Sequence, residues 1–221
     1  MTAATQAAPA ETRIEFAGNS VGLIVRGKTG PDHAPNNLEQ HADCVLPDGS
    51  PIGFFGEPGD HSGSGSGLGS WNRVGMNMQG VVYEYADFIR KDDGLRRPYV
   101  DIALARLEEI DLRSTLLIIN ASPPSTTLFA EYWNKLKLNP GGFFLIGANC
   151  STRASAAFVY AKLLPNGIPG LDTPDKLYRQ LVAELPGKTK SYSGYLGFTP
   201  KAGGGYSVVI EAPKKSAPRA K

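Results

Sequence analysis

Short apolar runs separated by Gly, Pro, Asn and Asp recur along this chain, and this pattern predicts β-strands. A turn signal, Pro47-Asp48-Gly49-Ser50, joins two of the runs and predicts a β-hairpin. The predicted strands cover residues 13–17, 21–26, 41–46, 51–56, 80–88, 116–119, 143–147, 192–198 and 206–210.

Apolar residues at helical spacing predict helices over residues 99–107, 126–138 and 154–164. A further helix is predicted from Thr173, which suits an N-cap, with Pro174 in the first turn, to about residue 185. Pro140-Gly141-Gly142 and Pro165-Asn166-Gly167 end the two helices that precede them.

The remaining segments define the expected domain organisation. Residues 1–12 are small and lack a period, and residues 212–221 form a short basic tail, so both are expected to be flexible. Residues 59–69 are rich in Gly and Ser, which is typical of a mobile loop or of a flap beside a substrate site. One domain is expected over residues 13–211, in which residues 59–138 contain an insertion or flap region.

Composition excludes several classes of protein. The 221 residues carry a formal net charge of +2, which gives no general field for binding nucleic acid. No run approaches the roughly 20 apolar residues of a membrane span, and no signal peptide is visible. The two cysteines and three histidines lack the short spacing of zinc ligands, so neither a metal nor another cofactor is expected.

Cys150 is the strongest candidate for a reactive residue. It lies at the junction between the predicted strand 143–147 and the predicted helix 154–164, among polar neighbours. Unpaired amides at a helix start stabilise a thiolate and can also donate to an oxyanion. The alternative is a structural thiol at the foot of a core helix.

A cysteine nucleophile needs a base, and the chain offers only His33, His41 and His61. His41 is preferred because it begins a predicted strand, whereas the other two lie in loops. Strand alternation places His41 with Asp43 on one face and Cys44 on the other, towards the core. A third group that would orient His41 is less well determined: Glu57 is the first choice, and Asp43 and His61 compete with it.

Two blocks of sequence resemble a known family. "His-Ala-Asp-Cys-Val-Leu-Pro-Asp-Gly-Ser-Pro-Ile-Gly-Phe-Phe" from His41 is similar to the histidine hairpin of permuted NlpC/P60 papain-like cysteine hydrolases. "Phe-Leu-Ile-Gly-Ala-Asn-Cys-Ser-Thr" around Cys150, with the helix and Gly-Ile-Pro-Gly-Leu-Asp-Thr-Pro-Asp-Lys-Leu-Tyr after it, resembles their nucleophile block. The histidine precedes the cysteine here, which is the permuted order. The closest resemblance is to peptidoglycan amidase effectors of bacterial type VI secretion.

The resemblance implies an α+β fold in which a central antiparallel sheet packs against helices and the nucleophile lies at a helix N-terminus. It implies a cysteine amidase or endopeptidase that cleaves peptidoglycan peptides, with Cys150 as nucleophile and His41 as base. Such an antibacterial toxin is made in the cytoplasm without a signal peptide and acts in the periplasm of a target cell. An immunity protein and a secretion carrier are the partners it implies.

Two other functions remain open from the sequence. Permuted papain-like relatives also include acyltransferases and deacylases that act on lipid or protein, so the same dyad could serve another substrate. A binding or adaptor domain without turnover is the third reading, and it would follow if His41 lay far from Cys150 or if Cys150 were fully buried.

Overall fold

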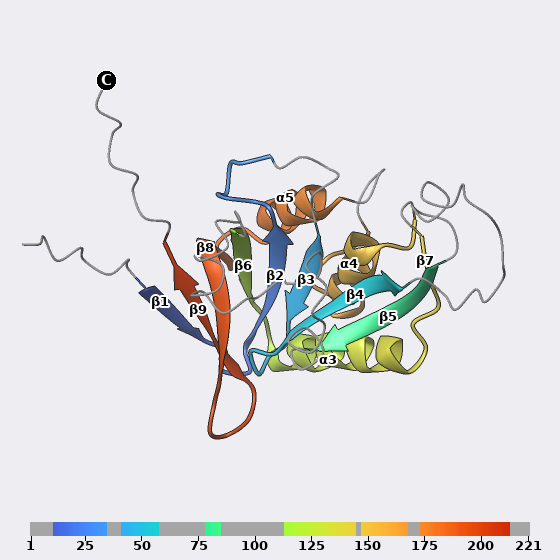
Figure 1. The fold of residues 1–221 in the computed structure, drawn as a ribbon, viewed down its shortest axis with the longest axis horizontal. Helices are drawn as coiled ribbons and strands as arrows, with labels where there is room; N and C mark the ends of the chain where they lie inside the picture. Colours follow the sequence, from blue (N-terminus) through green and yellow to red (C-terminus); the bar gives the residue numbers. More distant parts are fainter. Residues whose placement is uncertain are drawn as a thin grey trace, which may run out of the picture.

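The protein has an α+β fold, in which the described residues form one large antiparallel sheet and three helices. A computed structural model describes residues 11–34, 41–57, 78–84, 113–144, 147–167 and 173–212. Within this part of the chain, nine strands form a sheet in the order β1-β9-β8-β6-β2-β3-β4-β5-β7 (Figure 1). Every neighbouring pair of strands is antiparallel.

The elements follow the order of the chain. The strands are β1 (Glu11–Glu15), β2 (Ser20–Arg26), β3 (Ala42–Val45), β4 (Pro51–Glu57), β5 (Met78–Glu84), β6 (Ser114–Asn120), β7 (Gly142–Phe143), β8 (Thr189–Pro200) and β9 (Tyr206–Glu211). The helices are α3 (Pro123–Leu138), α4 (Cys150–Tyr160) and α5 (Pro174–Glu184).

The middle of the sheet is buried on both faces because hydrophobic layers cover it on both sides. Residues of β2 alternate between the two layers: Leu23 joins the layer beside the helices, and Ile24 joins the opposite layer. The helix-side layer is filled by large side chains of α3 and α4, among them Trp133, Phe129 and Phe158. Such burial explains why β2 and β6 read as nearly continuous apolar runs in the sequence.

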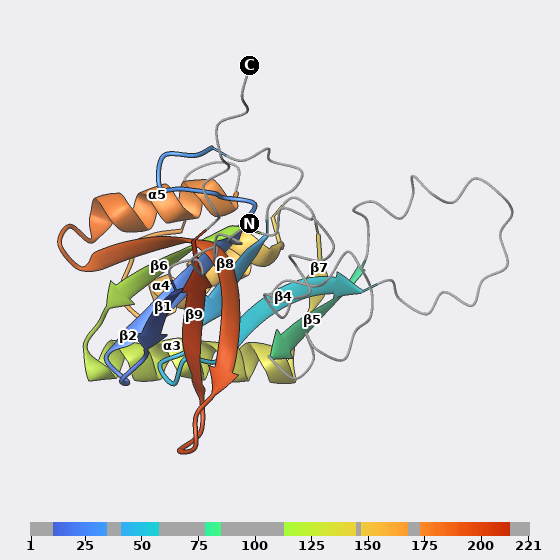
Figure 2. The ribbon, with the colours of Figure 1, turned by 60° about the vertical axis from the view of Figure 1, so that its left-hand side comes forward.

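The second layer forms where the β8–β9 hairpin folds over the sheet. One half of β8 pairs with β6 and the other half pairs with β9, and Gly194 lies where the two halves meet. Figure 2 shows this hairpin in front of β2 and β6, on the side away from the helices. Next to the turn of this hairpin, the Tyr206 amide donates to the Asp48 carbonyl in the β3–β4 turn at 3.0 Å, which ties the hairpin to that turn.

Most predicted strands and helices are confirmed within one to four residues, including the hairpin around Gly49 and the helix that follows Thr173. Of the strand predicted over residues 143–147, the structure describes residues 143, 144 and 147, and among these only Phe143 belongs to a strand. Gly142–Phe143 form this strand at the sheet edge, and an isolated bridge joins Phe144 to Ala148. Gly147 has a φ of 98°, a turn conformation that glycine adopts without strain.

The remaining predictions concern the middle and the two ends of the chain. Within the range 59–138, β5, β6 and α3 are parts of the common sheet and its helix layer. The Gly/Ser segment 59–69, the helix predicted over 99–107 and both predicted terminal segments lie largely or wholly outside the described residues.

No helix in the described part of the chain is long and apolar enough to cross a membrane.

Candidate active site

Cys150 is the first residue of α4, as the sequence predicts for a junction residue. The helix is capped by Asn149, whose Oδ1 accepts hydrogen bonds from the Thr152 amide at 3.0 Å and from the Ser151 hydroxyl at 2.9 Å. An N-cap of this kind fixes the first turn, so the position of the Cys150 side chain follows from the cap. The sulfur therefore lies at the end of the helix that carries partial positive charge.

His41 is held by the strand register of the sheet. Val25 of β2 pairs with Ala42 of β3, and the next bond continues this ladder beyond β3: the Arg26 amide donates to the His41 carbonyl at 3.0 Å. The imidazole ring stacks on the Phe55 ring, with centroids 4.3 Å apart. Backbone pairing and stacking together fix the direction of the ring.

The structure brings His41 and Cys150 close enough for the charge of each to shift the pKa of the other. Burial raises the pKa of the Cys150 thiol, but the charge of His41, its hydrogen bond and a backbone hydrogen bond from Ala42 together lower it below the ordinary value. The Cys150 side chain is almost fully buried, with 7% of the residue exposed, whereas the His41 side chain is 19% exposed. The two residues are 109 positions apart in sequence, and only the fold makes them neighbours.

Asp43 completes this group from the same strand as His41. Its Oδ1 lies 2.9 Å from Nε2 of His41, and because an ionised carboxylate only accepts, Nε2 is the donor. This bond leaves Nδ1 as the ring nitrogen available to the sulfur of Cys150. Asp43 was one of the two alternatives to Glu57 for the orienting group.

The charges around His41 favour its protonated form. Burial lowers the pKa of His41, but the negative charges of Asp43 and Cys150 outweigh burial and raise it to about 9. The pKa of Cys150 is lowered at the same time, so each partner favours the charged form of the other.

Arg26 holds the other oxygen of the Asp43 carboxylate. Nε and Nη2 of Arg26 lie 2.7 Å and 2.6 Å from Oδ2 of Asp43. Local sequence does not identify this residue, because Arg26 is the polar end of an apolar strand and no local motif links it to Asp43. Strand register is the signal that could have found it, since pairing β2 with β3 sets Arg26 opposite His41.

The other candidate residues lie elsewhere. Cys44 is fully buried in the helix-side layer, as alternation predicts, and burial raises the pKa of its thiol well above the ordinary value. His33 lies in the turn after β2, where its Nδ1 accepts from the Thr29 amide at 3.3 Å. Glu57 is the last residue of β4, and its side chain, like all of His61, lies outside the described residues.

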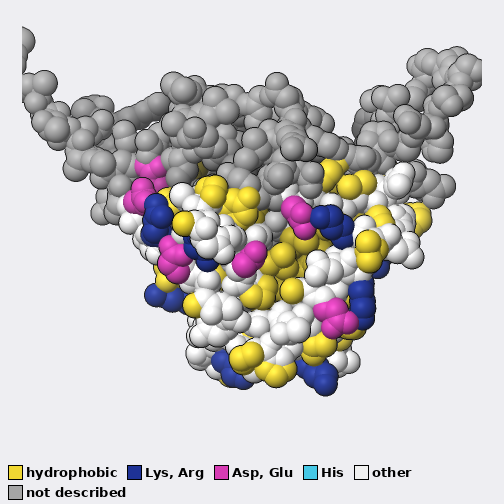
Figure 3. Space-filling model, turned by 90° about the horizontal axis from the view of Figure 1, so that it is seen from below, with side chains coloured by type: hydrophobic (Ala, Val, Ile, Leu, Met, Phe, Trp, Pro, Cys, Tyr) yellow, Lys and Arg dark blue, Asp and Glu magenta, His cyan; other side chains and the backbone are white. Residues whose placement is uncertain are grey.

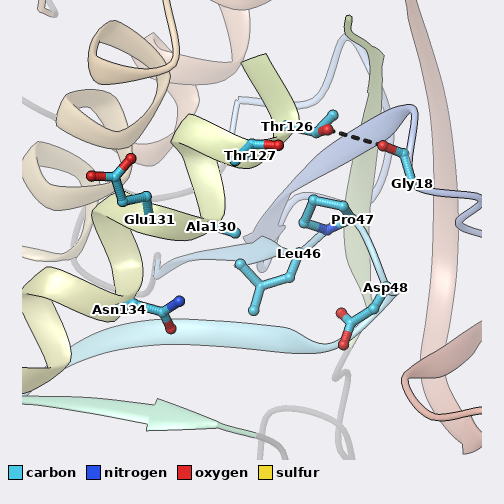
Figure 4. Close-up of a pocket in the computed structure, with 9 residues that line it drawn as sticks. All are labelled: Gly18, Leu46, Pro47, Asp48, Thr126, Thr127, Ala130, Glu131 and Asn134. Atoms are coloured by element: carbon cyan, nitrogen blue, oxygen red, sulfur yellow. Dashed lines mark hydrogen bonds between the residues drawn. The ribbon is translucent and has the colours of Figure 1, made fainter. Parts of the chain in front are cut away.

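A separate groove lies at the opposite end of β3. It is bordered by α3 and by the β3–β4 turn, and Leu46 and Ala130 form part of its apolar lining (Figure 4). Figure 3 shows this face of the molecule, with hydrophobic side chains in a hollow and acidic side chains around it. The groove contains neither His41 nor Cys150, so the structure does not connect it to the candidate dyad.

No group of three or more metal-ligating side chains occurs among the residues that the structure describes.

Comparison with known proteins gives no further identification: no family model, no curated protein and no solved structure matches this chain.

Proposed function

We propose that this protein is a cysteine hydrolase that cleaves amide bonds, with Cys150 as nucleophile, His41 as acid and base, and Asp43 as the residue that orients His41. The observation that carries this proposal is the contact between a thiol with a lowered pKa at a helix start and an imidazole with a raised pKa. A cysteine activated by a positioned histidine is the usual arrangement of a thiol nucleophile. Asp43 replaces Glu57 in the proposed triad because its carboxylate accepts from Nε2 of His41.

In the proposed reaction the Cys150 thiolate attacks the carbonyl carbon and forms a tetrahedral oxyanion. The Cys150 amide is one of the helix-start amides that have no acceptor within the helix ladder, so it is suited to hold that oxyanion. The imidazolium of His41 gives its proton to the leaving amine, and the C–N bond breaks to leave a thioester. His41 then takes a proton from water, the hydroxide attacks the thioester, and Cys150 is released as the carboxylic acid departs.

The finer proposal is a permuted papain-like hydrolase that acts on peptidoglycan peptides as a type VI secretion effector. It is supported by the resemblance of the two sequence blocks and by the order of the residues, with the histidine strand preceding the cysteine helix. The antiparallel sheet beside α4 is compatible with such an architecture. An immunity protein, a secretion carrier and action in a periplasm are parts of the same proposal.

The test is cleavage of purified peptidoglycan and of soluble muropeptides, followed by mass spectrometry of the products. We expect the native protein to release fragments with one new amine and one new carboxylate. Cys150→Ala and His41→Ala should each lose at least about a thousandfold in rate, since each removes a whole role in the reaction. Cys44→Ala is the matched control, because it removes the other thiol and leaves both side chains of the dyad in place.

Three results would contradict the proposal. Full cleavage by folded Cys150→Ala would remove the nucleophile from the mechanism. A native protein that cleaves no muropeptide but becomes acylated at Cys150 by an activated thioester would keep the dyad and replace the substrate with that of an acyltransferase or deacylase. A thiol at Cys150 that is inert to alkylating agents throughout the neutral range would favour a binding domain without turnover.

A further inference from the structure

The carboxylate of Asp43 is fully buried and contacts both His41 and Arg26. Oδ1 lies 2.9 Å from Nε2 of His41, and Oδ2 lies within 2.7 Å of two nitrogens of Arg26. A buried carboxylate is costly unless it is paired and hydrogen-bonded. The contacts of Arg26 with Oδ2 therefore offset part of the cost of this burial.

Phe55 supports the same group from the neighbouring strand. The His41 ring stacks on Phe55, and the guanidinium of Arg26 lies over the same ring, 5.5 Å from its centroid. Arg26 is also bonded to His41 through its own backbone amide. Three strands, β2, β3 and β4, therefore contribute to one rigid unit around His41.

We propose that Arg26 is a positioning residue of the candidate site: it clamps Oδ2 of Asp43 so that Oδ1 faces His41, and its charge opposes that of Asp43 at the imidazole. The catalytic meaning of this role rests on the proposed function, but the role itself can be measured in the resting protein. Arg26 need not touch a substrate to act in this way.

The electrostatic part follows from the groups that face His41. Asp43 from β3 and Cys150 from α4 raise the pKa of His41, whereas Arg26 from β2 lowers it. β4 contributes the Phe55 ring, which carries no charge. Arg26 therefore offsets part of the Asp43 field and keeps the imidazolium a stronger acid than Asp43 alone would allow.

The geometric part depends on the shape of the guanidinium. Two of its three nitrogens contact Oδ2 of Asp43, and the guanidinium also lies over the ring of Phe55. A lysine ammonium is a point charge and cannot reproduce both contacts. Lysine at this position would keep the charge and lose the clamp, so the two functions of Arg26 can be separated by substitution.

The test is an NMR titration of His41 in the full-length native protein and in Arg26→Gln and Arg26→Lys. Only three histidines are present, so substitution of His33 and His61 identifies the signal of His41. We expect Arg26→Gln to raise the pKa of His41 by about one unit, which is the shift that the loss of one nearby charge close to the protein surface should cause. Arg26→Lys should leave the pKa near the native value and lower the rate of Cys150 alkylation at neutral pH by roughly tenfold.

Arg179→Gln is the matched control, because it removes an arginine from an exposed ion pair with Asp175. It should leave the His41 titration and Cys150 alkylation unchanged. If Arg26→Gln does not fold, the single variant Asp43→Asn is compared with the double variant Asp43→Asn/Arg26→Gln. The double variant removes both charges of the ion pair, so it leaves neither partner unpaired. Removal of Arg26 should raise the pKa of His41 there as well.

An unchanged pKa of His41 in folded Arg26→Gln, or in the double variant relative to Asp43→Asn, would overturn the inference. This outcome is independent of the proposed function, because the titration requires no turnover. Conversely, a protein that cleaves nothing but shows the expected shift would refute the hydrolase and retain the role of Arg26.

Discussion

Asp43 accepts a hydrogen bond from His41 at 2.9 Å, and the two residues are only two positions apart in the chain. Residues two apart point to the same side of a strand, so this contact needs no long-range folding event. Cys150, by contrast, comes to His41 from the start of α4, more than one hundred residues later. The candidate site therefore combines one local contact with one contact that only the fold creates.

Asp43→Asn should lower the pKa of His41, because it removes the negative charge that contributes most to raising it. The imidazolium is then less stable, and the thiolate of Cys150 loses part of its counter-charge. We expect the NMR titration midpoint of His41 to fall and the rate of Cys150 alkylation at pH 7 to fall about tenfold or more. Asp48→Asn, in the exposed β3–β4 turn, is the control and should change neither. A titration midpoint that stays near pH 9 would show that Asp43 does not act on His41.

Iodoacetamide should modify Cys150 at neutral pH, because the pKa of its thiol is lowered. It should spare Cys44, because that thiol is buried and its pKa is raised. Peptide mapping by mass spectrometry distinguishes the two thiols. His41→Ala should move the onset of Cys150 alkylation to higher pH, because both the charge and the hydrogen bond of His41 are lost. Equal modification of the two thiols in folded protein would be incompatible with this arrangement.

Asn149→Ala should remove the α4 cap and cost about 1 kcal/mol of stability. It should also slow Cys150 alkylation, because the first turn of α4 holds the sulfur. Thr173→Ala is a matched control: Thr173 caps a different helix, α5, and accepts from the Lys176 amide at 3.3 Å. We expect a similar loss in denaturant unfolding for both variants and a loss of thiol reactivity for Asn149→Ala alone.

Gly53→Ala should disturb the Asp43 carboxylate directly. A Cβ at this position would lie within 2.0 Å of Oδ1 of Asp43, which is far too close for two unbonded atoms. We expect a loss of about 1–3 kcal/mol in unfolding free energy and a lower pKa of His41. Gly203→Ala is the control, since an added Cβ there meets nothing within 4 Å. Native-like stability and titration for Gly53→Ala would contradict the observed packing.

The dependence of the unfolding free energy on pH should reflect the raised pKa of His41. The pKa of His41 is about 9 in the folded protein and about 6.5 when unfolded. Its contribution to stability is therefore fully present below about pH 6.5 and is lost as the pH rises towards 9. Denaturant unfolding of the native protein and of His41→Gln at pH 6, 7.5 and 9 should show a difference that shrinks over this range. A difference that grows with pH would mean that His41 is buried in its neutral form.

The opposite sign applies to Cys150, whose pKa is lowered on folding. Its contribution is present above its unfolded pKa and is lost as the pH falls through the folded value. Comparison with Cys150→Ala in the same unfolding series therefore separates the two partners of the pair.

The sequence by itself determined most of the secondary structure and both members of the candidate dyad. Apolar runs predicted the central strands β2 and β6, and alternation predicted that Cys44 faces the core. The Thr173-Pro174 cap predicted the start of α5. These features depend on neighbouring residues in the chain, so local patterns are sufficient to recognise them.

Tertiary structure decided what the local patterns could not. It set Arg26 opposite His41 through strand register, and it gave Asp43 an arginine partner. It also placed Phe143 in a two-residue strand at the margin of the sheet, where this strand pairs with β5. Pairing between distant segments fixes which charges meet, and the charges that meet set the proton affinity of His41 and of Cys150.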